Sequence, residues 1–115
     1  MMGLPSERDE DLRGIVHLAR EISSLGEKQK LHPNIKVSVS TFVPKPHTPF
    51  QWESQIPLEV MKEILSFFRS ELKRNSLRFK WQDPHLSFLE GVFSMGDRHL
   101  SRVLIEAHRL GCRFD

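Results

Sequence analysis

Three prolines within six residues, at positions 44, 46 and 49, constrain the fold of this chain more than any other feature. Each proline removes a backbone N–H donor and fixes one φ angle, so a strand that reaches this segment must leave its sheet there. The residues just before the prolines form the clearest strand, because apolar and polar residues alternate over positions 35–40 and residues 41–43 extend the run. We therefore expect a strand over residues 35–43, followed by a stiff, extended and exposed loop.

Four amphipathic helices are expected around this strand, because apolar residues recur at spacings of three and four, which places them on one face. Gly26 is a stop signal for the first helix, and Pro57 suits the first turn of the second, which Asn75 would end. Asp83 and Pro84 suit the N-cap and first residue of the third, and Asp97 could cap the fourth. The residues expected to be buried are Leu12, Ile15, Val16, Ala19, Ile22 and Leu25, then Leu58, Met61, Ile64, Leu65, Phe68 and Leu72, then Leu86, Leu89, Val92 and Phe93, and finally Leu100, Val103, Leu104 and Ala107.

Two further strand segments complete the pattern. Residues 77–81 alternate apolar and basic side chains, and residues 1–5 are typical of the end of a strand that runs at once into a turn. Strands that alternate with helices of this length pair in parallel. The expected fold class is therefore α/β, with two to three parallel strands and four helices. A parallel sheet normally has several strands and two covered faces, so this set is an incomplete α/β layer.

The composition excludes several classes of protein. The 115 residues include 17 Lys and Arg against 15 Asp and Glu, and this net charge of +2 is too small to argue for a nucleic-acid-binding protein. A single cysteine, Cys112, excludes an internal disulfide and a multi-cysteine metal site. No apolar run is long enough to span a membrane, and no signal peptide is recognisable, so we expect a cytoplasmic protein.

Two segments, taken together, resemble the C-terminal half of the radical S-adenosylmethionine (radical SAM) barrel. The first is MGLPSE, at residues 2–7, which is similar to the Gly-(Leu/Phe)-Pro-x-Glu turn after the fifth barrel strand. The second is VSVSTFVPKPHTPF, at residues 37–50, which is similar to the proline-rich segment after the sixth strand. This second segment looks most like the iron–sulfur oxidoreductase-like subfamily with an N-terminal cobalamin-binding domain, where residues 77–115 also have counterparts. The resemblance spans nearly the whole chain.

The resemblance implies a partial (β/α) radical SAM-type TIM barrel. Residues 1–76 would supply barrel units from the end of the fifth strand to the sixth helix, and residues 77–115 a short strand plus a two-helix C-terminal extension. Such enzymes use a 4Fe-4S cluster, held by a CxxxCxxC loop, to cleave S-adenosylmethionine into a radical. That loop is absent here, and Cys112 alone cannot hold a cluster. We therefore expect a fragment of a larger enzyme that is inactive in isolation.

The same resemblance assigns cofactors and contact residues. The full-length parent would bind S-adenosylmethionine and the 4Fe-4S cluster, with cobalamin as a further candidate, whereas this chain would hold no cofactor by itself. The residues that would contact S-adenosylmethionine, chiefly its adenosyl part, are Gly3, Leu4, Pro5, Glu7, Phe42, Val43 and Pro44. No catalytic or metal-binding residue is assigned. Arg8 stands where the family often has a capping Ser or Thr, and Asp9 is the alternative cap.

Other interpretations of the sequence stay open. The chain could be a free-standing α/β protein-interaction module with no catalytic role. Ser38 and Ser40 suit either a polar barrel lumen or the wet side of a half-exposed strand. A basic stretch suits a nucleic acid, but acidic residues beside it favour a solvated helix end. Its residues are Lys73, Arg74, Arg78 and Lys80, followed by Trp81, with Glu71 and Asp83 nearby. The expected partners are the remainder of the parent polypeptide and a second copy bound through unpaired strand edges, with neither a membrane nor a nucleic acid.

Overall fold

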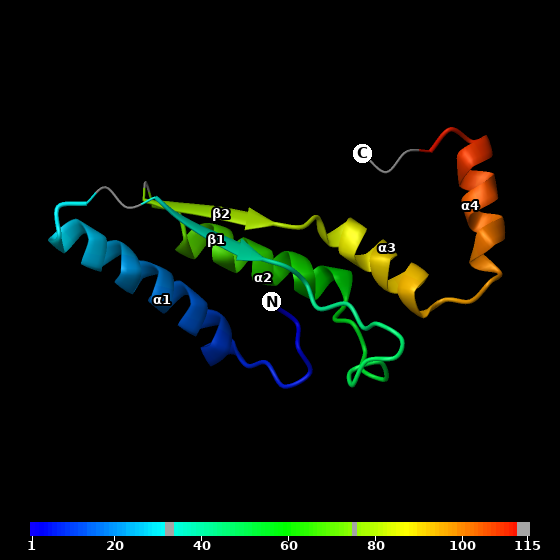
Figure 1. Cartoon of the computed structure of the whole chain (residues 1–115), viewed down its shortest axis with the longest axis horizontal. Coiled ribbons are helices and arrows are strands. Elements are labelled where there is room, and N and C mark those ends of the chain that lie inside the picture. Colours follow the sequence, from blue (N-terminus) through cyan, green and yellow to red (C-terminus); the bar gives the residue numbers. More distant parts are fainter. Residues whose placement is uncertain (32–33, 75, 113–115) are drawn as a thin grey trace.

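The computed structural model describes residues 1–31, 34–74 and 76–112. The elements in chain order are α1 (Asp9–Lys28), β1 (Ile35–Val39), α2 (Leu58–Glu71), β2 (Leu77–Trp81), α3 (Pro84–Met95) and α4 (Leu100–Arg109), as Figure 1 shows. The two strands form a parallel sheet. The described part of the chain is thus an α/β structure with four helices and a two-stranded parallel sheet, which is not closed into a barrel.

The N-terminus adds a third, very short extended segment to this sheet. β1 pairs with β2 in a register that sets Ile35 opposite Leu77. Directly after the end of β1, the Met2 N–H donates to the Ser40 carbonyl at 2.9 Å, and the Phe42 N–H donates to the Met2 carbonyl at 2.7 Å. These two hydrogen bonds form a parallel bridge between Met2 and Thr41. The expected strand end at the N-terminus therefore lies beside β1.

Helices α1 and α2 cover one face of the sheet. Their buried residues pack in one cluster with Val39 and Leu77, and Val37 and Phe79 pack against that cluster. The members of the cluster from α1, from α2 and from the C-cap of α2 are Leu12, Val16, Ala19, Met61, Leu65, Phe68 and Leu72. The opposite face consists of Lys36, Ser38, Arg78 and Lys80, all of which are exposed. We call these four residues the open face, and it is unusual because parallel sheets are normally covered on both sides.

The two ends of α1 differ from the sequence expectation. The helix begins after Arg8, whose N–H donates to the Asp11 carboxylate at 2.9 Å, so Asp9 is the first helical residue and not the cap. Gly26 does not stop the helix either. Lys30 adopts the left-handed conformation, with φ of 58°, and the Leu31 N–H closes back on the Gly26 carbonyl at 3.0 Å. This is the hydrogen-bond pattern of a Schellman motif, completed by lysine in the position that glycine favours.

The apolar stripe of α1 is buried over only part of its length. Leu12, Val16 and Ala19 are in the core, but Ile22 and Leu25 are exposed, contrary to expectation. Apart from β1 and β2, the described chain adds only the single bridge at Met2 to the sheet. No described strand therefore covers the side chains of Ile22 and Leu25.

Helix α2 follows the expectation closely. Met61, Leu65 and Phe68 are buried, and Pro57 is the N-cap, one residue before the first turn that was expected to hold it. The helix ends with Leu72 as its C-cap. The expected terminator, Asn75, lies outside the described residues.

Helices α3 and α4 bury less than their apolar residues suggest. α3 starts as expected, with the Asp83 carboxylate accepting the His85 N–H at 2.8 Å and Pro84 in its first turn, but its buried residues are Pro84, Ser87 and Gly91. In α4 no described residue is buried, and Val103 and Leu104 are each 54% exposed, so its expected inward face was wrong. The N-cap of α4 is His99, and Asp97 instead accepts the His99 N–H at 2.8 Å.

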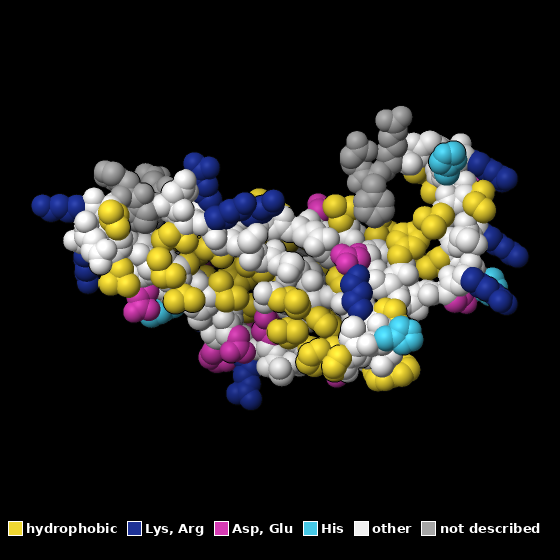
Figure 2. Space-filling model, viewed as in Figure 1, with side chains coloured by type: hydrophobic (Ala, Val, Ile, Leu, Met, Phe, Trp, Pro, Cys, Tyr) yellow, Lys and Arg dark blue, Asp and Glu magenta, His cyan; other side chains and the backbone are white. Residues whose placement is uncertain are grey.

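The apolar residues of α4 are exposed because of where the helix lies. It is at the opposite end of the molecule from α1 (Figure 1), and no described element packs over it. The radius of gyration is 17.8 Å, against about 13 Å for a compact chain of this length. Figure 2 shows hydrophobic side chains at the surface at that end. No helix in the described part is both long and apolar enough to cross a membrane.

The proline-containing loop is less extended than the sequence predicted. It leaves β1 in an extended conformation but turns at Pro46–His47 and again at residues 49–52. The Thr48 hydroxyl donates to the Lys45 carbonyl at 2.7 Å, and the Gln51 N–H donates to the Thr48 carbonyl at 3.1 Å. A proline φ near −65° suits the second residue of such turns, so prolines that end a strand also favour folding back. Pro44 is buried, so the loop is exposed only in part.

Candidate functional site

A pocket of about 450 Å³ lies where the extended segments of the sheet end. Leu4 comes from the turn after the N-terminal bridge, Phe42 and Val43 follow β1, and Gln82 follows β2. All three segments run in parallel, so their carboxyl ends meet at one edge of the sheet. In α/β proteins this edge is where ligands bind. Three of the seven residues assigned from the sequence, Leu4, Phe42 and Val43, thus line one cavity.

Gly3 and Glu7 shape the turn that presents Leu4. Gly3 has φ of +81°, and its N–H donates to Glu7 Oε2 at 2.6 Å. A Cβ built at Gly3 would approach the Ile56 side chain to 2.7 Å. Gly3 and Glu7 are therefore engaged in the turn itself, and neither is among the described lining residues of the pocket. Pro5 is exposed and also lies outside this lining.

Aromatic packing forms the apolar wall behind β1. Phe42 is buried, and its ring meets the Phe50 ring edge-on, with centroids 6.0 Å apart and an interplanar angle of 82°. Val43 is half-buried beside it. Pro44 is buried but is not among the described lining residues. Phe42, Val43 and Phe50 therefore form the apolar wall of the pocket, and Pro44 is buried outside the lining.

One ion pair closes the side of the pocket that faces α3. Lys45 Nζ lies 2.5 Å from Glu90 Oε1 and donates to Ser94 Oγ at 3.0 Å. Gln82 Nε2 donates to the other Glu90 oxygen at 3.3 Å. The hydrogen bond from Lys45 stabilises the ionised carboxylate and lowers the pKa of Glu90. The Glu90 carboxylate of α3 thus contacts both Lys45 of the proline-containing loop and Gln82, which follows β2.

Thr41 is a buried polar residue of the pocket lining. Its Oγ1 has no hydrogen-bond partner among the described residues. Leaving a buried hydroxyl unpaired costs free energy, about 1–3 kcal/mol in typical proteins. Ser87 Oγ, which is outside the described lining of this pocket, is unpartnered in the same way, so the Thr41 hydroxyl alone does not indicate a ligand.

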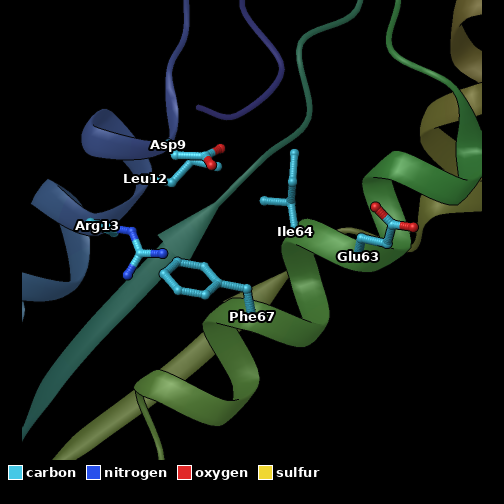
Figure 3. Close-up of a pocket in the computed structure, with 6 residues that line it drawn as sticks. All are labelled: Asp9, Leu12, Arg13, Glu63, Ile64 and Phe67. Atoms are coloured by element: carbon cyan, nitrogen blue, oxygen red, sulfur yellow. The ribbon is translucent and has the colours of Figure 1, made fainter.

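A second hollow, of about 240 Å³, lies between α1 and α2 and is drawn in Figure 3. Arg13 and Phe67 point toward one another across it, with the guanidinium carbon 5.8 Å from the ring centroid. Its described lining includes none of the seven assigned residues. It lies between the helices that cover the sheet, and we treat it as a packing groove.

The pocket has the size and lining of a small-molecule site, and its described lining includes no cysteine for an iron–sulfur cluster. A cavity of this volume with apolar walls and a few polar groups is typical of small-molecule sites. A cluster needs several thiolates, whereas Cys112 is exposed and lies near the end of the described chain. Within the described ranges, no three His, Cys, Asp or Glu side chains are grouped to hold a metal ion.

Several pocket residues were not expected from the sequence. Thr41, Lys45 and Phe50 lie within the second resembling segment, residues 37–50, but were not among the assigned contact residues. Gln82 and Glu90 carry no such signal, because they belong to separate elements that the fold brings to the pocket.

Comparison with known proteins gives one distant relative. The chain is 28% identical over 104 residues to an uncharacterized protein, MJ0966, of Methanocaldococcus jannaschii. The match covers 90% of this chain and 22% of MJ0966, so the chain spans about a fifth of that relative's length. No family model and no solved structure matches the chain.

Proposed function

We propose that this chain is part of a radical SAM iron–sulfur enzyme and forms part of the wall that binds S-adenosylmethionine and substrate. The pocket carries the proposal: Leu4, Phe42 and Val43 come from the two segments that resemble the family, and they line one cavity at the carboxyl edge of parallel strands. Parallel pairing brings any such turns to this edge, so the proposal rests on the resemblance of both segments to the family together with their shared place in the pocket.

The half-covered sheet supports the finer proposal of a partial TIM barrel. In a (β/α) barrel, helices cover the outer face of the strands and the inner face lines the lumen. Here α1 and α2 cover one face, and the open face is polar. Residues 1–76 would supply barrel units, and residues 77–115 a strand with a two-helix extension.

The proposed parent is a larger cytoplasmic polypeptide that holds the cofactors. S-adenosylmethionine, the 4Fe-4S cluster and, as a further candidate, cobalamin would bind the parent, and this chain alone would be inactive. A match that covers only 22% of MJ0966 supports a place within a longer protein. The chief partner is then the remainder of that polypeptide.

The coding sequence upstream of residue 1 tests this proposal directly. We expect an open frame that encodes a CxxxCxxC loop roughly 100 or more residues before Gly3, the distance that four preceding β/α units need. A stop codon immediately before Met1 would contradict it. Anaerobic incubation of the purified chain with iron, sulfide and S-adenosylmethionine should yield neither a cluster chromophore nor tight binding.

The wall itself can be tested on the purified chain by NMR with millimolar 5′-deoxyadenosine. We expect weak binding that shifts the resonances of Leu4 and Phe42. Val43→Thr, which keeps the shape but adds a hydroxyl to the pocket, should weaken those shifts. Val103→Thr makes the same change on exposed α4 and should leave them unchanged. Equal shifts in both variants would contradict a binding wall at Val43.

The alternative is a free-standing α/β protein-interaction module, which the exposed apolar residues of α4 favour. Val103, Leu104 and Ile105 are each more than half exposed, as expected for a helix that meets another protein. This alternative predicts a complete reading frame that starts at Met1, so the upstream sequence also separates the two functions.

A further inference from the structure

The open face of the sheet concentrates positive charge. Lys36 lies directly opposite Arg78, and Ser38 lies directly opposite Lys80. All four side chains are exposed. Figure 2 shows Lys and Arg side chains at the margin of the molecule over the two strands. Three of the four positions on this face are therefore cationic.

These cations lack counter-ions within the described chain. None of Lys36, Arg78 and Lys80 forms an ion pair with a described residue, whereas Arg20 and Lys45 each pair with a glutamate. Like charges directly opposite one another on neighbouring strands destabilise a sheet. An anion bound across the face would remove this repulsion.

The open face is continuous with the pocket. Ser40 and Gln82 line the pocket, and they also line a neighbouring hollow of about 440 Å³ that includes Ser38 and Lys80. Lys80 precedes Gln82 by two residues, a distance of roughly 7 Å along a strand. A small molecule could therefore contact Lys80 with one end and the pocket with the other.

We infer that the open face binds the phosphate group of a small substrate whose other end lies in the pocket. Lysine and arginine are both phosphate ligands, and the Ser38 hydroxyl adds a donor between them. A phosphate carries nearly two negative charges, which suits three cations better than the single charge of a carboxylate. The inference rests on the proposed function, because it takes the pocket as part of the wall that binds S-adenosylmethionine and substrate, and the open face as the lumen beside it.

The test is an NMR titration of the purified chain with inorganic phosphate, with sodium chloride added to hold the ionic strength constant. We expect phosphate to shift the backbone amides of β1 and β2. Lys80→Gln should weaken binding about tenfold, the effect of one charge-assisted hydrogen bond. Lys62→Gln removes the same charge from an exposed site on α2 and should leave the midpoint unchanged.

Three results would overturn the inference. One is an equal loss in the Lys80 and Lys62 variants, and another is an equal response to chloride, since both would indicate only a general ion atmosphere. The third is a response to single-stranded DNA that exceeds the phosphate response and depends on Lys73 and Arg74, which would indicate a nucleic-acid surface.

The phosphate titration and the 5′-deoxyadenosine titration test the phosphate site and the proposed function separately. Loss of the phosphate response with retention of the 5′-deoxyadenosine shifts at Leu4 would reject the phosphate site alone. Loss of those shifts with a normal phosphate response would reject the adenosyl wall alone.

Discussion

Gly3 is the residue on which the geometry of the N-terminal turn depends. Its φ of +81° is costly for any residue with a Cβ, and a Cβ there would also displace the Ile56 side chain. We expect Gly3→Ala to lower the free energy of unfolding by about 1–2 kcal/mol. Urea unfolding at neutral pH measures this change.

Gly14 provides the matched control, because it lies within α1 and a Cβ there meets nothing within 4 Å. Gly14→Ala should raise the free energy of unfolding by up to about 1 kcal/mol, since alanine favours the helix. If both alanine variants were stabilised, the strain assigned to Gly3 would be wrong.

Lys45 and Glu90 form the contact that joins the proline loop to α3. Because the lysine lowers the pKa of Glu90 below its ordinary value of 4.5, the pair stabilises the folded chain above that pH. This contribution disappears as the pH falls through the lowered pKa. Both side chains are more than 40% exposed, so it should not exceed about 1 kcal/mol.

The corresponding prediction is that Lys45→Met raises the pKa of Glu90 toward 4.5. An NMR titration of the Glu90 side-chain carboxyl carbon measures it directly. Lys62→Met, which removes a lysine from the exposed side of α2, should leave the pKa of Glu90 where it is. An unchanged Glu90 pKa in the Lys45 variant would mean that the ion pair does not persist in solution.

The candidate site was predictable only where local sequence encodes it. Leu4, Phe42 and Val43 belong to two continuous segments, so a resemblance over a few residues could indicate them. Lys45 and Glu90 are 45 residues apart and meet only because α3 lies beside the proline loop. That placement depends on contacts such as the one from Gln55 Nε2 to the Ser87 carbonyl, at 2.8 Å, which no periodicity reveals.

At the scale of elements, the end of α1 offers a way to stabilise the chain. Lys30 holds a left-handed conformation that glycine adopts without steric cost. We expect Lys30→Gly to raise the free energy of unfolding by about 1 kcal/mol, measured in urea. Lys28→Gly makes the same substitution in the last turn of the helix and should lower it by a similar amount. Destabilisation by Lys30→Gly would contradict the Schellman motif.

Helices α2 and α4 should respond very differently to the loss of a leucine. Leu65 is 2% exposed within the core, so Leu65→Ala should cost about 2–5 kcal/mol. Leu104 is 54% exposed, and Leu104→Ala should change the free energy of unfolding by less than about 0.5 kcal/mol. Thermal unfolding of the two variants gives the comparison, and a large cost at Leu104 would mean that α4 packs on something in the isolated chain.

The elements were predictable to different degrees for one physical reason. Asp83 and Pro84 start α3 as expected because a cap is a local interaction. The buried faces of α3 and α4 were not predictable, because an apolar stripe shows that a helix can be buried but not what buries it. Ile22 and Leu25 of α1 are exposed for the same reason: they lie on the apolar stripe, but no described element covers them.

At the scale of the whole molecule, β2 is an unprotected edge within the described chain. It pairs with β1 on one side, and no described strand pairs with the other. Such an edge can pair with a second copy, so we predict a dimer whose population rises with concentration. Size-exclusion chromatography with light scattering measures it, and a monomer at every concentration would contradict it.

A pair of tryptophan variants locates the predicted interface. Trp81→Lys places a charge on the edge of β2 and should shift the equilibrium toward monomer, because lysine on an edge strand opposes pairing. Trp52→Lys makes the same change in the loop, where Trp52 is 86% exposed, and should leave the dimer intact. Equal dissociation by both would indicate association through exposed aromatic surface instead.

The central position of β1 determines the order in which the described chain loses its structure. β1 is hydrogen-bonded to β2, and the segment that directly follows β1 is hydrogen-bonded to Met2 through Ser40 and Phe42. β2 can separate by breaking one set of hydrogen bonds, whereas residues 35–42 are released only after both sets have broken. We therefore expect the amide hydrogens that residues 35–42 donate to β2 and to Met2 to exchange with deuterated water long after those of exposed α4.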